Sequence, residues 1–335
     1  MTRPLPLWIV TGFLGSGKTT LIRSLIRRPE FGRLAIVINE FGEIGLDHDI
    51  IEASSDDVYA LAGGCLCCMV RGELGETLAD MFARRAVGEL PAFDGVVIET
   101  SGLADPGPVE ELLSGQPLRG FFRLAAIVTV CDAVNGARTL AQEAVATAQA
   151  KAADILVITK ADLAPGTTLT ALETRLRDYA PDAALARSSE GRLDQDLVDA
   201  LIRAVRPERR RAKTRTGPPA HDFDRIRSRT LTLDTPLEPR GLEACVSVLK
   251  ALAGPHLMRA KALIVLPPPQ NPVILQAVQD TIYPPMRLAA VTHESPLSRM
   301  ILITRGIEQD AIDAALRKSG LADSVRKMDE PPRHG

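Results

Sequence analysis

The sequence predicts an α/β protein with a doubly wound, mostly parallel sheet, followed by a second, smaller α+β domain. Two observations support this prediction. Apolar runs of strand length alternate with segments of helical periodicity from the N-terminus to residue 179, which is typical of a parallel sheet covered by helices on both faces. An abrupt change of composition near residue 206 then separates this part from a shorter region of strands and helices.

The first predicted strand and helix enclose a glycine-rich segment. The apolar run LWIVT begins at residue 7 and leads into GFLGSGKT at residues 12–19, which fits the pattern G-x-x-x-x-G-K-[ST]. Glycines 12, 15 and 17 allow positive φ angles, so successive backbone N–H groups can point at a polyphosphate. Apolar residues at helical spacing follow from residue 20, which places a helix N-terminus beside the anion. This segment is a phosphate-binding loop, with Lys18 facing the β- and γ-phosphates and the Thr19 hydroxyl placed for Mg²⁺.

The alternation continues along the first part of the chain, which we assign to a P-loop NTPase domain over residues 1–205. Strands are predicted at residues 34–38, 58–61, 95–98, 124–130 and 155–159. Helices are predicted at residues 72–85, 137–151 and 169–179.

The composition changes in the basic stretch RPERRRAKTRTGPP, within a linker assigned to residues 206–222. A solvated linker is favoured over a nucleic-acid patch because the stretch is short and lacks aromatic residues. The second domain is assigned to residues 223–322, with strands at 226–233, 262–266, 273–278 and 300–304 and helices at 239–252 and 307–316. The charged tail from residue 327 is expected to fray.

Composition narrows the class of partner. The net charge of −2 gives no global field that favours nucleic acid or an anionic membrane, and 4% aromatic residues supply few stacking platforms. No apolar run approaches the roughly 20 residues of a membrane helix. Three of the five cysteines lie within four residues, which suits metal or redox chemistry in a reducing compartment rather than a disulfide framework. A cytoplasmic protein without nucleic-acid or membrane partners is therefore expected.

One further position completes the predicted catalytic set with Lys18 and Thr19, and another is predicted to bind the nucleotide. Glu99 follows the apolar strand at 95–98 and provides a carboxylate for Mg²⁺. Gly102 follows at the spacing where its backbone N–H can contact a γ-phosphate, so residues 99–106 are a candidate switch segment.

The sequence TKAD at residues 159–162 bears on the choice of base. The Asp162 carboxylate can accept hydrogen bonds from guanine N1–H and N2–H₂ together, and the stem of Lys160 can stack on the base plane. The usual first residue of this motif is Asn, and Thr159 can make only part of its hydrogen-bond network to the phosphate loop. The segment is therefore predicted to bind guanine. The alternative is that it is an ordinary polar turn after a strand.

Cys65, Cys67 and Cys68 lie in a loop that follows two glycines. Thiolates are soft ligands that suit Zn²⁺ or a similar ion, and a complete tetrahedral site needs a ligand from elsewhere, for which Glu40 is a candidate. Buried structural cysteines or a redox-sensing pair are the alternatives.

The segments GFLGSGKTT, NEFGEIGLD, GGCLCC, ETSGLADP and TKAD occur in this order before a small C-terminal domain. Together they resemble the CobW-type GTPases, metallochaperones related to the hydrogenase- and urease-maturation proteins. The resemblance implies hydrolysis of GTP to GDP and phosphate, coupled to binding and delivery of zinc or cobalt. A client metalloprotein or a cobalamin-pathway enzyme would receive the ion, and a nucleotide-dependent homo-oligomer is compatible with the resemblance.

The resemblance also assigns roles to particular residues. It makes Cys65, Cys67 and Cys68 ligands of the transition metal with Glu40 nearby, and it makes Asp162 the reader of guanine. Residues 12–20, including Ser16 and Thr20, would bind phosphate and Mg²⁺. Two other functions compete with this one: a P-loop kinase acting on a small molecule, and a scaffold that binds zinc whatever the nucleotide.

Overall fold

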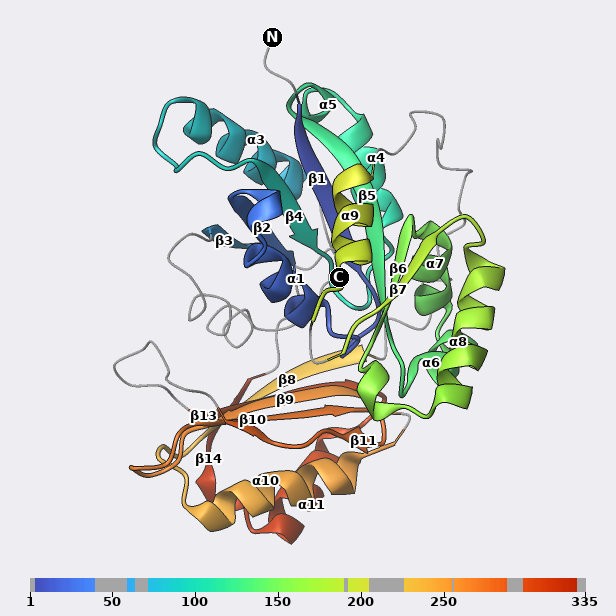
Figure 1. Cartoon of the computed structure of the whole chain (residues 1–335). Coiled ribbons are helices and arrows are strands. Elements are labelled where there is room, and N and C mark those ends of the chain that lie inside the picture. Colours follow the sequence, from blue (N-terminus) through green and yellow to red (C-terminus); the bar gives the residue numbers. More distant parts are fainter. Residues whose placement is uncertain are drawn as a thin grey trace. The chain divides into compact units, whose positions relative to one another are not determined.

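The computed structural model describes residues 4–39, 59–63, 72–189, 192–204, 226–254, 256–287 and 298–329. The described residues fall into two compact units, of which the first runs to residue 204 and the second starts at residue 226 (Figure 1). The domain boundaries expected at 205/206 and 222/223 lie outside the described residues and stay predictions. Within the described ranges, no helix has both the length and the apolar character of a membrane span.

The first unit is built on a sheet in which all seven described strands run parallel, in the order β3-β2-β4-β1-β5-β6-β7. This arrangement confirms the predicted parallel α/β domain. The strands are β1 (Leu5–Thr11), β2 (Leu34–Asn39), β3 (Tyr59–Gly63), β4 (Gly95–Glu99), β5 (Phe122–Asp132), β6 (Ile155–Thr159) and β7 (Ala184–Arg187).

Helices cover both faces of this sheet because successive side chains of a buried strand point in opposite directions. On one face, Leu7 and Ile9 of β1 pack with apolar side chains of α3, α4 and α5. On the other, the Trp8 indole N–H donates to the Leu201 carbonyl of α9 at 3.1 Å. The helices are α1 (Lys18–Ile26), α3 (Gly72–Ala86), α4 (Gly107–Ser114), α5 (Leu118–Phe121), α6 (Gly136–Gln142), α7 (Ala144–Ala152), α8 (Gly166–Tyr179) and α9 (Gln195–Arg203), with 3-10 turns η1 (Pro29–Phe31) and η3 (Ala161–Leu163).

The helix predicted at residues 137–151 is wrong as a single element, because the chain forms α6 and α7 instead. Glu143 between them takes an extended conformation, with φ −114° and ψ 107°. The Thr147 hydroxyl donates to the Leu140 carbonyl at 3.1 Å, which satisfies an acceptor in the last turn of α6. The apolar spacing runs through the break, so the sequence pattern alone does not reveal it. The elements α4, α5, β7 and α9 were not predicted.

The parallel order brings the carboxyl ends of β1, β4, β5 and β6 to one edge of the sheet, where ligands bind in open α/β folds. Strand β1 lies between β4 and β5, with Val10 opposite Glu99 on one side and Thr11 opposite Thr129 on the other. Strand β6 follows β5, with Asp132 opposite Thr159. Four loops that are far apart in the sequence therefore leave the sheet side by side.

The second unit is an antiparallel sheet with two helices, which confirms the predicted small α+β domain. The described strands have the order β11-β10-β9-β13-β8-β14, and β12 also pairs with β10. They are β8 (Ile226–Leu233), β9 (Leu257–Ile264), β10 (Val273–Val278), β11 (Thr281–Ile282), β12 (Met286–Arg287), β13 (Ser298–Arg305) and β14 (Val325–Asp329). The helices are α10 (Pro239–Leu252) and α11 (Gln309–Ser319), with the 3-10 turn η5 (Ala322–Ser324).

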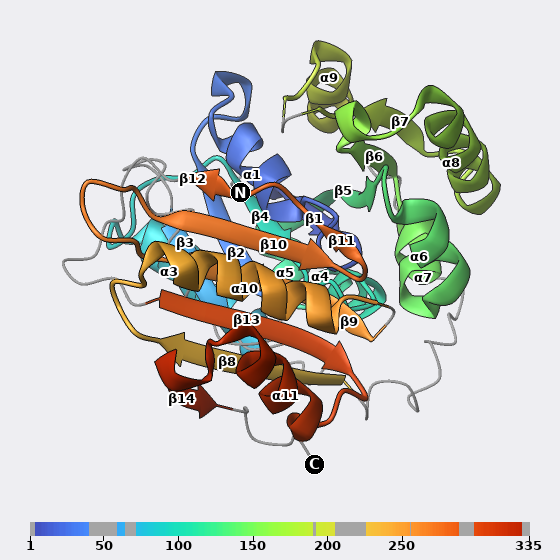
Figure 2. The same ribbon diagram turned by 90° about the horizontal axis from the view of Figure 1, so that it is seen from below.

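Helices α10 and α11 lie side by side over one face of this sheet (Figure 2). They bury an apolar core with side chains from β8, β9, β10 and β13, including Leu249, Ile312 and Leu302. The expectation that the chain frays from residue 327 is wrong as far as Asp329, because β14 pairs with β8 and sets Met328 opposite Leu231.

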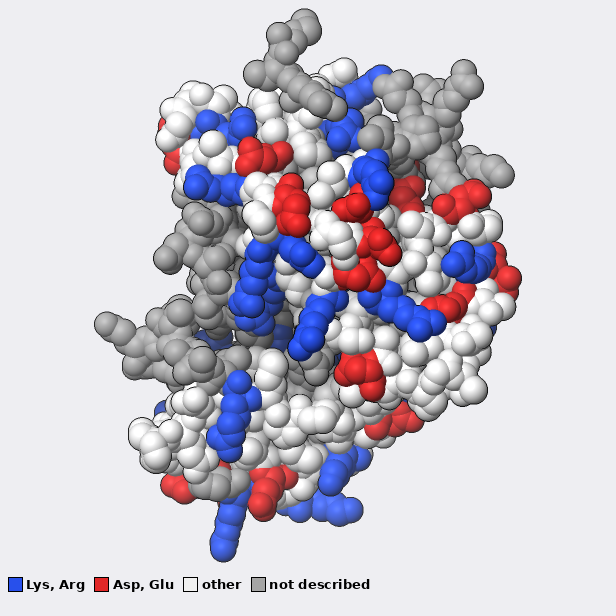
Figure 3. All heavy atoms as spheres, viewed as in Figure 1, with Lys and Arg blue, Asp and Glu red and all other residues white. Residues whose placement is uncertain are grey.

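Charged side chains of both signs lie close together over the face of the first unit seen in Figure 3. Surface ion pairs such as Arg203–Asp199 in α9, with 2.7 Å between guanidinium nitrogen and carboxylate oxygen, follow the same pattern. This mixture agrees with the formal net charge of −2.

Candidate nucleotide site

The phosphate-binding loop joins β1 to α1 at the carboxyl edge of the first sheet. Gly12, Gly15 and Gly17 have φ angles of 138°, 70° and 98°, values that side chains with a Cβ rarely adopt. Packing reinforces the requirement at Gly12, where a Cβ would lie 2.1 Å from the carbonyl oxygen of Val130. The loop therefore depends on glycine both for its turns and for its close approach to β5. Helix α1 starts directly after it, so the first N–H groups of the helix point toward the loop.

The polar side chains of the loop are mostly buried. Lys18 is 4% exposed, and its ammonium donates to the carbonyls of Gly12 at 2.9 Å and Phe13 at 3.4 Å. Ser16 is 2% exposed, and its hydroxyl oxygen has no hydrogen-bond partner within the described residues. Thr20 lies exposed in the first turn of α1. The loop thus combines a buried cation with backbone conformations suited to anion binding.

Thr19 and Glu99 meet although 80 residues separate them in the sequence. The Thr19 hydroxyl lies 2.9 Å and 3.2 Å from the two carboxylate oxygens of Glu99 and donates to that carboxylate. Glu99 ends β4 and is 1% exposed. A hydroxyl and a carboxylate at this spacing are the hard oxygen donors that Mg²⁺ prefers, so their chemistry fits the ion expected with a nucleotide.

The segment after β4 lies against the phosphate-binding loop. A Cβ on Gly102 would lie 2.6 Å from the backbone nitrogen of Leu14. The Thr100 hydroxyl donates to that of Thr11 at 2.8 Å, and the Thr100 N–H donates to the Val10 carbonyl at 3.0 Å. Glycine at 102 therefore permits a backbone-to-backbone approach between the candidate switch segment and the loop that would hold the phosphates.

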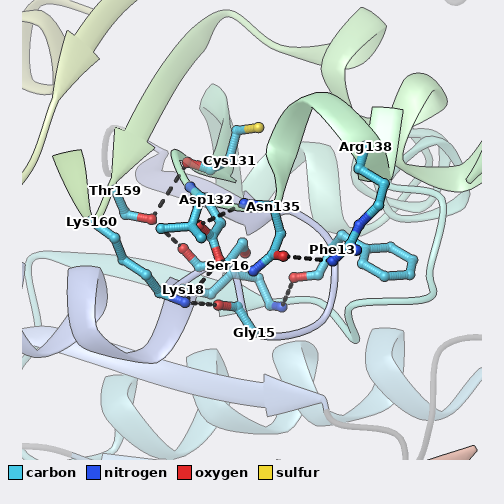
Figure 4. A network of polar contacts seen from close by, with 11 residues as sticks. Phe13, Gly15, Ser16, Lys18, Cys131, Asp132, Asn135, Arg138, Thr159 and Lys160 are labelled. Atoms are coloured by element: carbon cyan, nitrogen blue, oxygen red, sulfur yellow. Dashed lines mark hydrogen bonds and ion pairs between the residues drawn. The ribbon is translucent and has the colours of Figure 1, made fainter. Parts of the chain in front are cut away.

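The base-side loop contacts the phosphate-binding loop through Thr159 and Lys160 (Figure 4). The Thr159 hydroxyl donates to the Ser16 carbonyl at 2.5 Å. Lys160 has a left-handed conformation with φ 56°, and its ammonium donates to the Gly15 carbonyl at 2.8 Å. Thr159 therefore links the two loops directly through its single hydroxyl proton. Asp162 lies exposed in η3, the turn that follows.

Sequence reasoning missed one residue of this site, Asp132 at the end of β5. Its carboxylate oxygen Oδ2 lies 2.9 Å from the Lys160 ammonium, and the side chains of this ion pair are 7% and 19% exposed. Its other oxygen, Oδ1, accepts from the backbone N–H groups of Val134 at 2.6 Å and Asn135 at 3.2 Å. An acidic residue at the end of an apolar strand was the available signal, the same one that identified Glu99.

The residues predicted to hold a transition metal, Cys65, Cys67, Cys68 and Glu40, lie outside the described residues. Among the residues that are described, no group of three or more His, Cys, Asp or Glu side chains is arranged to hold a metal ion. Cys131 and Cys245 are buried free thiols that pack as small apolar side chains. Burial raises the pKa of each thiol to about 12, and the nearby Asp132 charge adds to this effect at Cys131.

The fold and site together define a nucleotide-binding protein with a glycine-rich loop between strand and helix, a buried lysine and a hydroxyl–carboxylate pair. Residues 6–187 match the family model described as "CobW/HypB/UreG, nucleotide-binding domain". Residues 226–319 match the model "Cobalamin synthesis protein cobW C-terminal domain". The chain therefore belongs to the CobW/HypB/UreG family, as its motifs suggested.

The chain is similar to individual proteins over different lengths. The chain is 28% identical to "Zinc chaperone YjiA" of Escherichia coli over 317 residues, which cover 93% of this chain and 98% of that protein. It is 33% identical to "Zinc-regulated GTPase metalloprotein activator 1" of Schizosaccharomyces pombe over 206 residues, which cover 59% of this chain and 49% of that protein. Among solved structures, the Zn(II)-bound YjiA GTPase from E. coli is 25% identical, with a TM-score of 0.48 and coverage of 96% of this chain and 99% of that one.

Proposed function

We propose that this protein hydrolyses GTP to GDP and phosphate and couples this reaction to binding and delivery of a transition-metal ion, with zinc as the first candidate. One contact is the main support for nucleotide binding. The hydroxyl of Thr19, which directly follows the buried lysine of the glycine-rich loop, lies 2.9 Å from a carboxylate oxygen of Glu99. A family model for nucleotide binding matches the same part of the chain.

Each element of the site has a role in this reaction. The N–H groups of the loop and of the first turn of α1 bind the phosphate oxygens, and Lys18 neutralises charge on the β- and γ-phosphates. Thr19 and Glu99 would hold Mg²⁺ through their oxygen atoms, and the ion would supply neutralisation of phosphate charge. Gly102 presents its backbone N–H to the γ-phosphate, so residues 99–106 respond to whether that group is present.

Guanine selection rests on the loop after β6. The exposed Asp162 carboxylate accepts from N1–H and N2–H₂ of guanine, a pair of donors that adenine does not offer in this geometry. Lys160, held by Asp132 and the Gly15 carbonyl, covers the base plane with its stem. The hydrogen bond from Thr159 to Ser16 takes over the linking role of an asparagine amide. We therefore expect GTP to bind more tightly than ATP, and Asp162→Asn to reduce this preference.

The metal is the cargo of the protein, and we propose Cys65, Cys67 and Cys68 as its ligands, with Glu40 as a fourth. Thiolates favour zinc and similar soft or borderline ions over the magnesium held by oxygen donors. Two relatives carry names that state a zinc chaperone and a zinc-regulated activator of metalloproteins, which supports zinc as cargo and a metalloprotein as recipient. Three clustered thiols suit the reducing cytoplasm, where we place the protein.

One experiment tests this proposal as a whole. GTP and ATP hydrolysis are measured with and without Zn²⁺, in the wild type and in a variant with all three cysteines changed to serine. The proposal predicts hydrolysis of GTP in preference to ATP, and a response to Zn²⁺ that the variant lacks. Phosphate transfer to an added small-molecule acceptor would favour the kinase. Zinc retention that ignores the nucleotide, with equal GTPase rates in both proteins, would favour the scaffold and contradict the coupling.

A further inference from the structure

Gln149, in the last turn of α7, is 0% exposed and reaches from its helix to the candidate switch segment. Its side-chain nitrogen Nε2 donates to the carbonyls of Gly102 at 3.2 Å and Ala104 at 2.9 Å. Both protons of one amide group therefore hold two carbonyls of the same short segment. Those carbonyls lie on either side of Leu103, which is 1% exposed.

The orientation of this amide is fixed by its surroundings. Two carbonyl oxygens face Nε2, and turning the amide over would set the Gln149 oxygen against both of them. In the observed orientation, the Gln149 oxygen Oε1 is buried and has no hydrogen-bond partner within the described residues. A buried acceptor without a partner lowers stability. An apolar side chain would avoid this penalty but would take the donor away from the Gly102 and Ala104 carbonyls, so the glutamine is accounted for by its hold on this segment.

Helix α7 is itself anchored at the same residue. The Thr129 hydroxyl of β5 donates to the Gln149 backbone carbonyl at 2.7 Å. That carbonyl belongs to the last turn of the helix, where the helix supplies no partner of its own. Thr129 also lies opposite Thr11 of β1 in the sheet. Gln149 is thus fixed to the central strands through its backbone, while its side chain holds the segment that follows β4.

The held segment is the one that approaches the phosphate-binding loop, since a Cβ on Gly102 would lie 2.6 Å from the Leu14 nitrogen. We propose that Gln149 is a positioning residue for GTP: it holds residues 102–104 so that the Gly102 N–H faces the γ-phosphate. This inference rests on the proposed GTPase function. It adds α7 to the parts of the fold that respond to the γ-phosphate. Any movement of Gly102 must either break its hydrogen bond with Gln149 or move Gln149 and α7 with it.

Gln149→Met tests the proposal because it keeps the length and volume of the side chain while removing both donors. Affinities for GDP and for the β,γ-imido analogue of GTP are measured with Mg²⁺ for each protein. GDP lacks the γ-phosphate, so its affinity should stay within about twofold, while analogue binding weakens about tenfold, as expected for two lost hydrogen bonds. The matched control is Thr147→Val, which removes the hydroxyl that α7 donates to the Leu140 carbonyl and leaves the contacts of Gln149 in place. This control should leave the ratio of the two affinities unchanged.

The outcomes separate this inference from the function on which it rests. A wild-type protein that binds neither guanine nucleotide overturns the proposed function itself. Wild-type binding combined with an unchanged ratio in Gln149→Met overturns only the role of Gln149. If Gln149→Met does not fold, exchange of the Gln149 side-chain amide protons in the ¹⁵N-labelled wild type decides the question. The proposal predicts slower exchange with the GTP analogue than with GDP, and equal exchange overturns it.

Discussion

The hydrogen bond between Thr159 and Ser16 gives a sharp test of how the base-side loop is held. Thr159→Val keeps the shape of a side chain that is 7% exposed but removes the donor that faces the Ser16 carbonyl at 2.5 Å. A lost buried hydrogen bond costs about 1 kcal/mol, and an acceptor left without a partner raises the total to about 2 kcal/mol. The free energy of unfolding of the first unit should fall by that amount.

Trp8 makes this change measurable in the first unit alone. It is the only tryptophan of the chain, it lies in β1, and it is 7% exposed. Its fluorescence in a urea titration therefore reports unfolding of the unit that holds the nucleotide site. If the nucleotide binds against both loops as proposed, the Kd for GDP should also rise, by about fivefold if half of the lost free energy bears on binding.

Thr174→Val is the matched control for this prediction. The Thr174 hydroxyl also donates to a backbone carbonyl, that of Thr170 at 3.0 Å, but it lies exposed on α8, where water can replace it. This variant should change the free energy of unfolding by less than about 0.5 kcal/mol. If Thr159→Val shows the same urea midpoint and the same Kd as Thr174→Val, the link between the two loops does not contribute as the structure indicates.

Three other predictions concern the phosphate loop, the magnesium ligands and the buried thiols. Gly12→Ala should abolish GTP binding in a titration, because its Cβ would lie 2.1 Å from the Val130 carbonyl and its φ of 138° disfavours alanine; full binding would contradict the role of the loop. Glu99→Gln should lower the rate of Mg²⁺-dependent hydrolysis by more than about tenfold while GDP still binds without Mg²⁺; an unchanged rate would remove Glu99 from the site. Burial raises the pKa of Cys131 and Cys245 to about 12 from 9.0, so their protonated thiols stabilise the fold fully below pH 9, and this contribution is lost as pH rises toward 12. In a pH series of urea titrations, the difference in unfolding free energy between the wild type and a variant with both changed to alanine should be constant below pH 9 and shrink as pH rises from 9 toward 12; a constant difference up to pH 12 would contradict the raised pKa values.

The sequence was sufficient to predict the parts of the site that depend on local backbone requirements. The glycines of the phosphate-binding loop, the lysine after them and the strand that ends at Glu99 each follow from short patterns. Thr19 and Glu99 were each expected to serve Mg²⁺, and the structure places their side chains in direct contact. The parallel sheet was predictable because its strands are uniformly apolar.

The missed features depend on contacts between distant residues. Asp132 and Lys160 are 28 residues apart and meet only because β5 and β6 are neighbours in the sheet. The contact of Gln149 with Gly102 spans 47 residues and needs the position of α7. The break at Glu143 occurs within a continuous apolar pattern, so helical periodicity could not reveal it. Strand β14 forms from a charged segment because β8 offers it an open edge.

The affinity of the protein for Zn²⁺, measured with a competing chelator in the presence of GDP and then of the GTP analogue, tests the central claim most directly. Coupled sites typically change each other's affinity by about 5- to 150-fold, and the effect on binding is reciprocal. We predict tighter zinc binding with the GTP analogue, so that hydrolysis favours release of the ion. Equal zinc affinities in the two nucleotide states would contradict the account, even if the protein binds both ligands well.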